Sequence, residues 1–300
     1  MKPSRLCFGS LSVSPLQANL DDNHAAELFC YALEKGINFF DTAELYRNYT
    51  HFQAFLGQVK RSDVVLATKC YAYDREGAKR SLDLALSTMR TDYLDFFLLH
   101  EQESEHTLRG HTPAIEYFLE QKELGIIHRF GISTHFVAGV TAATADNRID
   151  VVHPIINLKG IGIADGTRQD MEQAIAKLRR SDRFIYAMKA LGGGHLLASY
   201  HDALEYALSL DVDAIAIGMQ SREEIDRNLS AFSGNISTEP VQKSRRLMID
   251  EWCRGCGACA NRCQQQAIQV IDGQAVVERD KCVLCSYCVE ACPDFCIKVV

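Results

Sequence analysis

The stretch Gly36-Ile-Asn-Phe-Phe-Asp41-Thr-Ala-Glu-Leu-Tyr46 contains the structural unit that repeats through most of the chain. The apolar side chains of residues 25–33 before it have helical spacing, and Gly36 is a helix-stop signal. The apolar run 37–41 that follows is typical of a buried strand, and it ends on a charged side chain. A helix followed at once by a buried strand is the repeating unit of an α/β protein.

This unit recurs through residues 1–235. Short and nearly continuous apolar runs predict strands at residues 5–9, 37–41, 63–69, 94–100, 126–133, 151–157, 183–190 and 213–218. Helical spacing recurs at residues 80–89, 114–124, 171–178 and 204–210. Eight alternating strands and helices predict an α/β fold, a (β/α)8 TIM barrel. A doubly wound open sheet is the alternative, but no Gly-x-Gly-x-x-Gly follows the first strand.

Two cysteine runs define a second domain. They are Cys253-Arg-Gly-Cys256-Gly-Ala-Cys259-Ala-Asn-Arg-Cys263 and Cys282-Val-Leu-Cys285-Ser-Tyr-Cys288-Val-Glu-Ala-Cys292. Both have the spacing C-x2-C-x2-C-x3-C, which binds three thiolates to one [4Fe–4S] cluster and sends the fourth to another. Zinc ribbons also use C-x2-C pairs, but they need no third thiol at the same spacing. The runs therefore predict two [4Fe–4S] clusters, and Cys296, which lies outside both runs, is expected to be a spare.

The chain divides accordingly into a barrel (1–235), a linker (236–248) and a small α+β ferredoxin-like two-cluster domain (249–300). The net charge of −7 gives no basic face, which argues against nucleic acid as a partner. No apolar run approaches the ~20 residues that span a bilayer, and the first residues lack the apolar stretch of a signal peptide. Clustered cysteines bind metal where thiols stay reduced. We therefore expect a cytoplasmic protein without a membrane partner.

Four polar residues lie at or just beyond the ends of predicted strands. Asp41, Lys69 and His100 end the second, third and fourth strands, and Tyr46 follows in the loop after Asp41. The C-terminal strand ends of a TIM barrel form its active site. Asp41 and Lys69 could instead be a structural ion pair, and His100 a hydrogen-bonded core residue. Their occurrence together favours a catalytic role.

Residues 1–235 resemble the aldo-keto reductase family, because GINFFDTAELY, LATK and LDFFLLH correspond to its catalytic tetrad regions. The resemblance implies an oxidoreductase that interconverts small carbonyl and alcohol substrates with NADPH or NADH. It implies Tyr46 as the general acid and Lys69 as the cation that lowers the pKa of the phenol. It also implies that Asp41 holds Lys69 and that His100 orients the carbonyl. A phenol with a pKa of about 10 needs such a cation to exchange protons near neutrality.

The same resemblance implies a nicotinamide site, in which residues 131–135 are similar to a carboxamide-binding segment and residues 218–228 to a nucleotide-binding loop and helix. The implied contacts are Ser133, Thr134, His153, Met188, Gly192, Gly218, Ser221, Arg222 and Asn228. Thr134, His153, Met188 and Glu224 depart from the family's usual residues, and Arg222 could replace the usual arginine at a 2′-phosphate. The loop 192–194 is expected to approach a pyrophosphate closely, because glycine has no Cβ.

Residues 249–300 resemble a bacterial-type two-cluster ferredoxin. The resemblance implies one cluster on Cys253, Cys256, Cys259 and Cys292, and another on Cys263, Cys282, Cys285 and Cys288. Asp272-Gly273 predicts a hairpin between them. We expect the domain either to wall the substrate pocket or to lie at the far face of the barrel as a docking module.

Three functions are compatible with these features. The first is carbonyl and alcohol interconversion with Tyr46 as general acid, coupled to electron transfer through the clusters to a ferredoxin or another redox protein. The second is a reductase that takes electrons directly from its clusters without nicotinamide, which the departures at Thr134, Met188 and Glu224 motivate. The third is an electron-transfer or scaffold protein with an inactive barrel, against which the tetrad argues.

Overall fold

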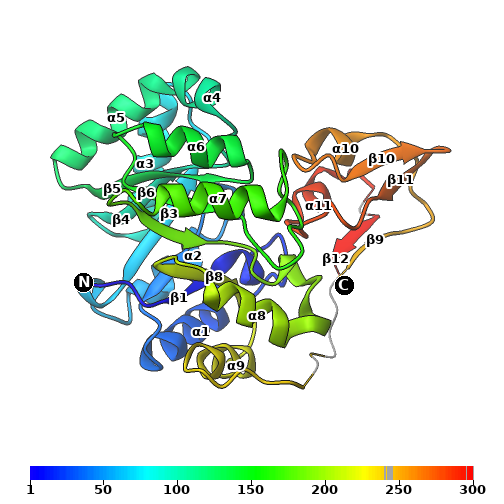
Figure 1. Cartoon of the computed structure of the whole chain (residues 1–300), viewed down its shortest axis with the longest axis horizontal. Coiled ribbons are helices and arrows are strands. Elements are labelled where there is room, and N and C mark those ends of the chain that lie inside the picture. The colour runs from blue at the N-terminus through cyan, green and yellow to red at the C-terminus, as the bar shows by residue number, and fades with distance from the viewer. Residues whose placement is uncertain (240, 242–245, 295, 300) are drawn as a thin grey trace.

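The computed structural model describes residues 1–239, 241, 246–294 and 296–299. Part of the predicted linker, residues 240 and 242–245, lies outside this description. Figure 1 shows a barrel with the smaller C-terminal domain, in orange and red, beside it. Within the described ranges, no helix is both long and apolar enough to cross a membrane.

The larger domain is a closed barrel in which the eight strands are parallel and lie in sequence order (Figure 1). The strands are β1 (Leu6–Gly9), β2 (Phe39–Asp41), β3 (Val65–Cys70), β4 (Leu94–Leu99), β5 (Ile127–Thr134), β6 (Val151–Pro154), β7 (Phe184–Ala187) and β8 (Ala214–Gly218). The helices are α1 (Asp22–Glu34), α2 (Tyr49–Leu56), α3 (Arg75–Met89), α4 (Glu105–Gly110), α5 (Thr112–Glu123), α6 (Val137–Ala145), α7 (Arg168–Leu178), α8 (Tyr200–Ser209) and α9 (Arg222–Phe232). The predicted (β/α)8 barrel is confirmed.

Helical periodicity did not predict α2, α4 and α6. The sequence of α6, VAGVTAATA, has no charged face, so no apolar stripe stands out against a polar one. The helices α2 and α4 are only 8 and 6 residues long, which is too short for a clear period.

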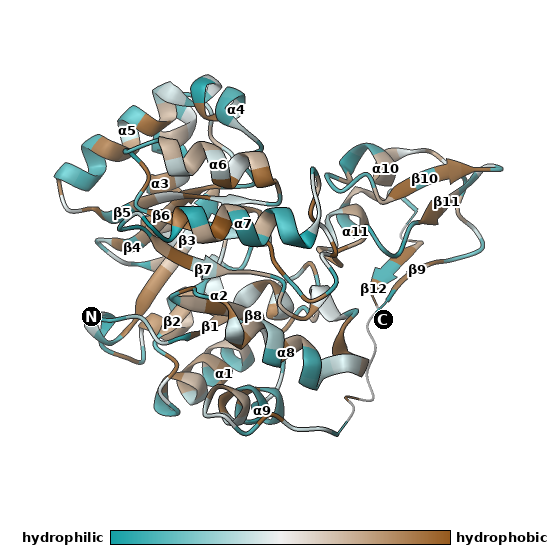
Figure 2. Cartoon of the chain, viewed as in Figure 1, coloured by the Kyte–Doolittle hydropathy of each residue, from teal (hydrophilic) through white to brown (hydrophobic). Residues whose placement is uncertain are grey.

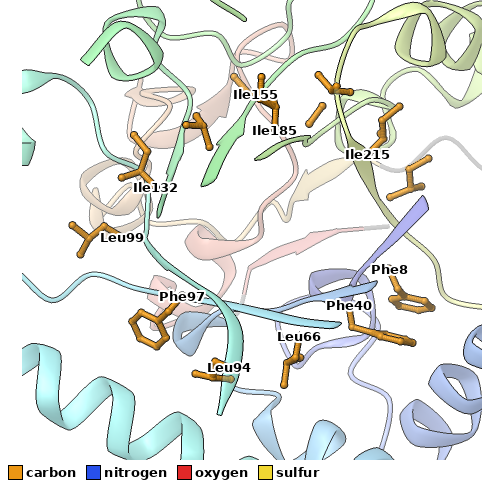
Figure 3. Close-up of a cluster of buried hydrophobic side chains, with 14 of the residues drawn as sticks. Phe8, Phe40, Leu66, Leu94, Phe97, Leu99, Ile132, Ile155, Ile185 and Ile215 are labelled. Carbon is orange, nitrogen blue, oxygen red and sulfur yellow. The ribbon is translucent and has the colours of Figure 1, made fainter. Parts of the chain in front are cut away.

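Alternate side chains of each strand face two different cores. Cys7, Phe39 and Val65 point into the barrel and form its interior with residues from the other strands. Their neighbours Phe8 and Phe40 point outward and pack under the helices, as Figure 3 shows. Because both faces of each strand are buried, the strands appear in the sequence as continuous apolar runs.

In its described residues, 246–294 and 296–299, the C-terminal domain has two small antiparallel sheets and two short helices. Its elements are β9 (Leu247–Ile249), α10 (Ala258–Arg262), β10 (Ile268–Ile271), β11 (Gln274–Val277), α11 (Tyr287–Ala291) and β12 (Ile297–Val299). Strand β9 pairs with β12, and β10 pairs with β11 across the predicted hairpin turn at Asp272-Gly273. The hairpin is confirmed. Strand β9 begins inside the stretch predicted as linker, because its pairing with β12 extends the domain's sheet to Leu247.

The C-terminal domain covers the loops at the C-terminal strand ends. Helix α11 lies toward the barrel, whereas the hydrophobic hairpin β10–β11 extends away from it (Figures 1 and 2). Glu290 on α11 forms an ion pair with Arg47, and the Gln265 amide lies 2.6 Å from His135 Nδ1. The domain therefore lies beside the strand ends and not at the far face of the barrel.

Candidate active site

Asp41 and Lys69 form a buried ion pair at the ends of β2 and β3. The Lys69 ammonium group donates to both carboxylate oxygens of Asp41 at 2.7 Å and to the Thr42 carbonyl at 2.8 Å. Lys69 is 1% exposed and Asp41 4%. A buried charge is tolerated when it is paired and its donors are satisfied, as they are here.

Tyr46 lies beside this pair in a short 3-10 turn, Glu44–Tyr46. Lys69 Nζ is 5.3 Å from the centroid of the Tyr46 ring. Burial, followed by the charge of Asp41, raises the pKa of Tyr46 well above its usual 10.0. Lys69 directs its N–H groups to Asp41 and Thr42, so burial dominates at the phenol, and the lowering of its pKa by Lys69 that the resemblance implied stays a prediction.

His100 directly follows β4 and faces the same site. Its ring lies 5.9 Å from that of Tyr46 in an edge-on arrangement and stacks on Tyr71 at 4.6 Å. Burial, assisted by the charge of Lys69, lowers the pKa of His100 well below 6.5, so the ring is neutral near neutrality. Its Nδ1 is buried and has no partner among the described residues. The structure therefore brings the four predicted strand-end residues together.

Two further residues complete the buried network around Asp41. The Tyr186 hydroxyl donates to Asp41 Oδ1 at 2.9 Å, and the Tyr186 ring stacks on His153 at 3.7 Å. Sequence analysis did not single out Tyr186, because it considered polar residues only at strand ends. The available signal was a hydroxyl-bearing residue inside the apolar run of β7.

A cavity of about 410 Å³ opens next to Tyr46, between the ends of β1, β7 and β8 and helix α9. Cofactors and other small ligands commonly bind in pockets of this size. Five of the implied nicotinamide contacts line it: His153, Met188, Gly218, Ser221 and Asn228. Four others do not: Ser133, Thr134, Gly192 and Arg222.

Three of these four residues, Ser133, Thr134 and Arg222, have polar side chains that make local contacts outside the cavity. The Ser133 hydroxyl accepts the Glu101 backbone N–H at 2.9 Å, and the Thr134 hydroxyl accepts that of Phe136 at 2.9 Å. The Arg222 guanidinium lies over the Tyr31 ring, 4.9 Å from its centroid.

Arg227 lines the cavity in place of Arg222. Its Nη1 atom is buried and has no partner among the described residues. Sequence analysis missed this arginine, although Arg227 lies one helical turn after Glu224 and next to Asn228, which also line the cavity.

A model of the aldo/keto reductase family matches residues 5–205, about two thirds of the chain. The chain belongs to the aldo/keto reductase family. A model of a 4Fe-4S dicluster domain matches residues 247–293 of this aldo/keto reductase.

Known proteins resemble large parts of this aldo/keto reductase. L-galactose dehydrogenase of Arabidopsis thaliana is 23% identical over 273 residues, covering 78% of this chain and 85% of its own. The uncharacterized oxidoreductase YqkF of Bacillus subtilis is 30% identical over 150 residues, 44% of this chain and 46% of its own. A putative aldo-keto reductase from Pseudomonas aeruginosa has the same fold, with a TM-score of 0.65 and 21% identity over 78% of this chain and 91% of its own.

The cysteines of the reductase's C-terminal domain line two separate cavities. Cys253, Cys256, Cys259 and Cys292 line one, and Cys263, Cys282, Cys285 and Cys288 line the other. This grouping is the crossed one, in which each run contributes one thiol to the other run's set. Cys296, expected to be a spare, also lines the first cavity, with its sulfur 3.3 Å from that of Cys292.

The spacing of the thiols fits a cluster better than a single metal ion. Two thiolates on one Zn²⁺ lie within about 4.6 Å of each other, twice the Zn–S distance. Among the described residues, no three cysteine sulfurs lie within 4.8 Å of one another. A cluster of four irons and four sulfides holds its thiolates farther apart, so both cavities suit [4Fe–4S] clusters.

The loop between Cys282 and Cys285 inserts into the barrel. Val283 is 2% exposed and packs with the barrel core. A Cβ on Gly162 would lie 2.2 Å from the Val283 side chain, and one on Gly193 would lie 2.1 Å from its carbonyl oxygen. The loop 192–194 was expected to approach a pyrophosphate, but at Gly193 the close approach is to the cluster domain.

Gly193→Ala should therefore displace the cluster domain. Its Cβ would clash with the Val283 backbone, and overpacking of this kind costs ~1–3 kcal/mol. We expect faster amide hydrogen exchange in residues 282–288. Gly125→Ala is the matched control, because Gly125 has a similar φ of +76° against +71° but no atom within 4 Å of its Cβ position. Equal exchange in both variants would contradict this docking contact.

Proposed function

We propose that this aldo/keto reductase reduces a small carbonyl compound to an alcohol with hydride from a nicotinamide cofactor and a proton from Tyr46, and that two [4Fe–4S] clusters exchange single electrons with a redox protein. The observation that carries the proposal is the buried Lys69–Asp41 pair beside Tyr46 and His100, at the wall of a cavity. The strand-end position of these residues agrees with the active sites of TIM barrels.

Each of the four residues has a role that follows from its surroundings. Tyr46 keeps its proton because its pKa is raised, and it donates this proton to the carbonyl oxygen as the carbonyl carbon gains hydride. His100 is neutral and its Nδ1 is unpaired, so its ring is free to hydrogen-bond the carbonyl and orient it. Lys69 and Asp41 form the buried ion pair at the base of the site, and the Tyr186 hydroxyl donates a hydrogen bond that positions Asp41.

NADPH or NADH would supply the hydride when bound in the cavity. The lining residues Gly218, Ser221 and Asn228 would hold it, and the unpaired Arg227 nitrogen would meet a phosphate group. This fit supports nicotinamide as the cofactor.

The two cysteine sets would hold clusters that carry one electron each. Tyr287, which lies between the proposed ligands Cys285 and Cys288, packs on Tyr46 together with Cys285. This contact supports participation of the clusters in turnover, with a ferredoxin or another redox protein as the electron partner. Thiols that must stay reduced until they bind iron support a cytoplasmic location.

A second candidate function is reduction driven by the clusters without nicotinamide. It is favoured by the glycine loop, whose Gly193 packs against Val283 of the cluster domain, and by the acidic first turn of α9, Glu223 and Glu224, where a phosphate would meet like charge.

Anaerobic titration with NADPH and NADH separates these candidates. We expect the wild type to bind the nucleotide saturably and to reduce a carbonyl compound with it. Binding should be at least tenfold weaker in Arg227→Met, because the phosphate would lose its guanidinium partner. Arg222→Met is the matched control, because Arg222 stacks on Tyr31 outside the cavity. Absence of nucleotide binding in cluster-replete protein, with reduction by a chemical electron donor, would instead establish the second candidate.

The pKa values of Tyr46 and His100 predict the pH profile. The pKa of Tyr46 lies well above 10.0 and that of His100 well below 6.5, so both stay neutral between these values. We expect kcat/KM for carbonyl reduction to be flat over this range. Alcohol oxidation needs a deprotonated Tyr46 and should increase toward the alkaline end. A decline of carbonyl reduction within this range that disappears in His100→Gln would contradict a neutral His100.

A further inference from the structure

Lys189 is a cation at the junction of the barrel, the cavity and the cluster domain. It follows β7 by two residues, lines the cavity together with Tyr46, and donates from Nζ to the Val283 carbonyl at 3.3 Å. Its φ of +62° is rare for a residue with a side chain, and such outliers occur where the surrounding structure holds them for a purpose.

No carboxylate neutralises Lys189. Among the described residues, no carboxylate oxygen lies within 4.0 Å of its ammonium group. Glu101, an acidic group near it, instead accepts the Tyr71 hydroxyl at 2.6 Å. Burial lowers the pKa of Lys189, so nearby negative charge would stabilise its ammonium form.

The cysteine loop of the cluster domain would provide that charge through Cys282 and Cys285, once these thiols bind a cluster. The residue that accepts the hydrogen bond from Lys189, Val283, lies between these two cysteines in the chain. A [4Fe–4S] cluster on four thiolates carries net negative charge, which increases when the cluster is reduced.

We propose that Lys189 is the counter-charge of the cluster bound by Cys263, Cys282, Cys285 and Cys288, and that it raises the reduction potential of this cluster. The inference rests on the proposed function only in requiring that these thiols bind a cluster. A fixed positive charge in a poorly solvated site stabilises the reduced state more than the oxidised state. The cavity of Cys253, Cys256, Cys259 and Cys292 is lined by a different cation, Arg254, whose charge is already paired with Asp294.

An anaerobic redox titration followed by electron paramagnetic resonance tests this role in the full chain. Lys189→Gln keeps a donor for the Val283 carbonyl but removes the charge, and Lys189→Met provides a second neutral variant. Lys189→Arg retains the charge. Lys281→Gln is the matched control, because Lys281 is next to Cys282 in sequence but its side chain is 53% exposed, so solvent screens its charge.

We expect both neutral variants to disfavour reduction of one cluster by about tenfold or more, which is ~59 mV for one electron. The reduction equilibrium of the other cluster should change less than threefold in these variants. In Lys189→Arg and Lys281→Gln, the reduction equilibria of both clusters should change less than threefold. Unchanged potentials in the neutral variants, or an equal shift in Lys281→Gln, would overturn the proposal. Wild-type protein without iron or cluster signals would refute the cluster assignment instead, which separates the two failures.

Discussion

Tyr46→Phe should lower kcat/KM for carbonyl reduction by about 100- to 10,000-fold, the usual contribution of a positioned proton donor. The substitution removes only the hydroxyl and keeps the ring that packs against Ala43, Leu16 and Tyr287. Binding of nicotinamide and the cluster signals should therefore remain. Steady-state kinetics with a small aldehyde or ketone, together with the iron content, provide the measurement.

Tyr49→Phe is the control for this substitution. Tyr49 is also buried, but its hydroxyl bonds to Thr68 and it does not line the cavity. Its loss should cost about 1 kcal/mol of stability and leave turnover within a few-fold of the wild type. If Tyr46→Phe behaved like Tyr49→Phe, another group would have to donate the proton.

Cys263→Ala should remove the cluster that lies near the barrel, although Cys263 belongs to the first cysteine run. In the structure this thiol lines the cavity of Cys282, Cys285 and Cys288. Iron should decrease from about eight to about four atoms per chain. The paramagnetic signal that disappears should be the same one that Cys282→Ala removes.

Cys292→Ala should remove the other signal, unless Cys296, whose sulfur is 3.3 Å away, replaces the lost ligand. The double variant Cys292→Ala with Cys296→Ala resolves this case. Cys30→Ala, a partly buried thiol on α1, should keep all the iron. If Cys263→Ala and Cys253→Ala removed the same signal, the thiols would be paired within each run, contrary to the cavities.

Local patterns were sufficient to predict the barrel and the polar ends of its strands. Buried parallel strands appear as apolar runs, and Asp41, Lys69 and His100 interrupt such runs where the strands end. The cysteine runs could also be predicted from a local pattern, because cluster ligation fixes the spacing of the cysteines.

Contacts between distant parts of the chain could not be predicted in this way. Tyr287 contacts Tyr46, and Lys189 contacts Val283, only because the cluster domain lies on the strand ends. Whether Arg222 or Arg227 lines the cavity depends on the rotation of α9, which its packing on the barrel sets. The pKa direction at Tyr46 likewise follows from burial by residues of both domains.

The loop between Cys282 and Cys285 forms part of both the proposed cluster site and the barrel mouth. Its cysteines are proposed ligands, and its Val283 fills the space at the barrel mouth between Gly162 and Gly193. Segments between metal ligands take their shape from the metal. Binding of a cluster would therefore also help to shape this side of the barrel mouth.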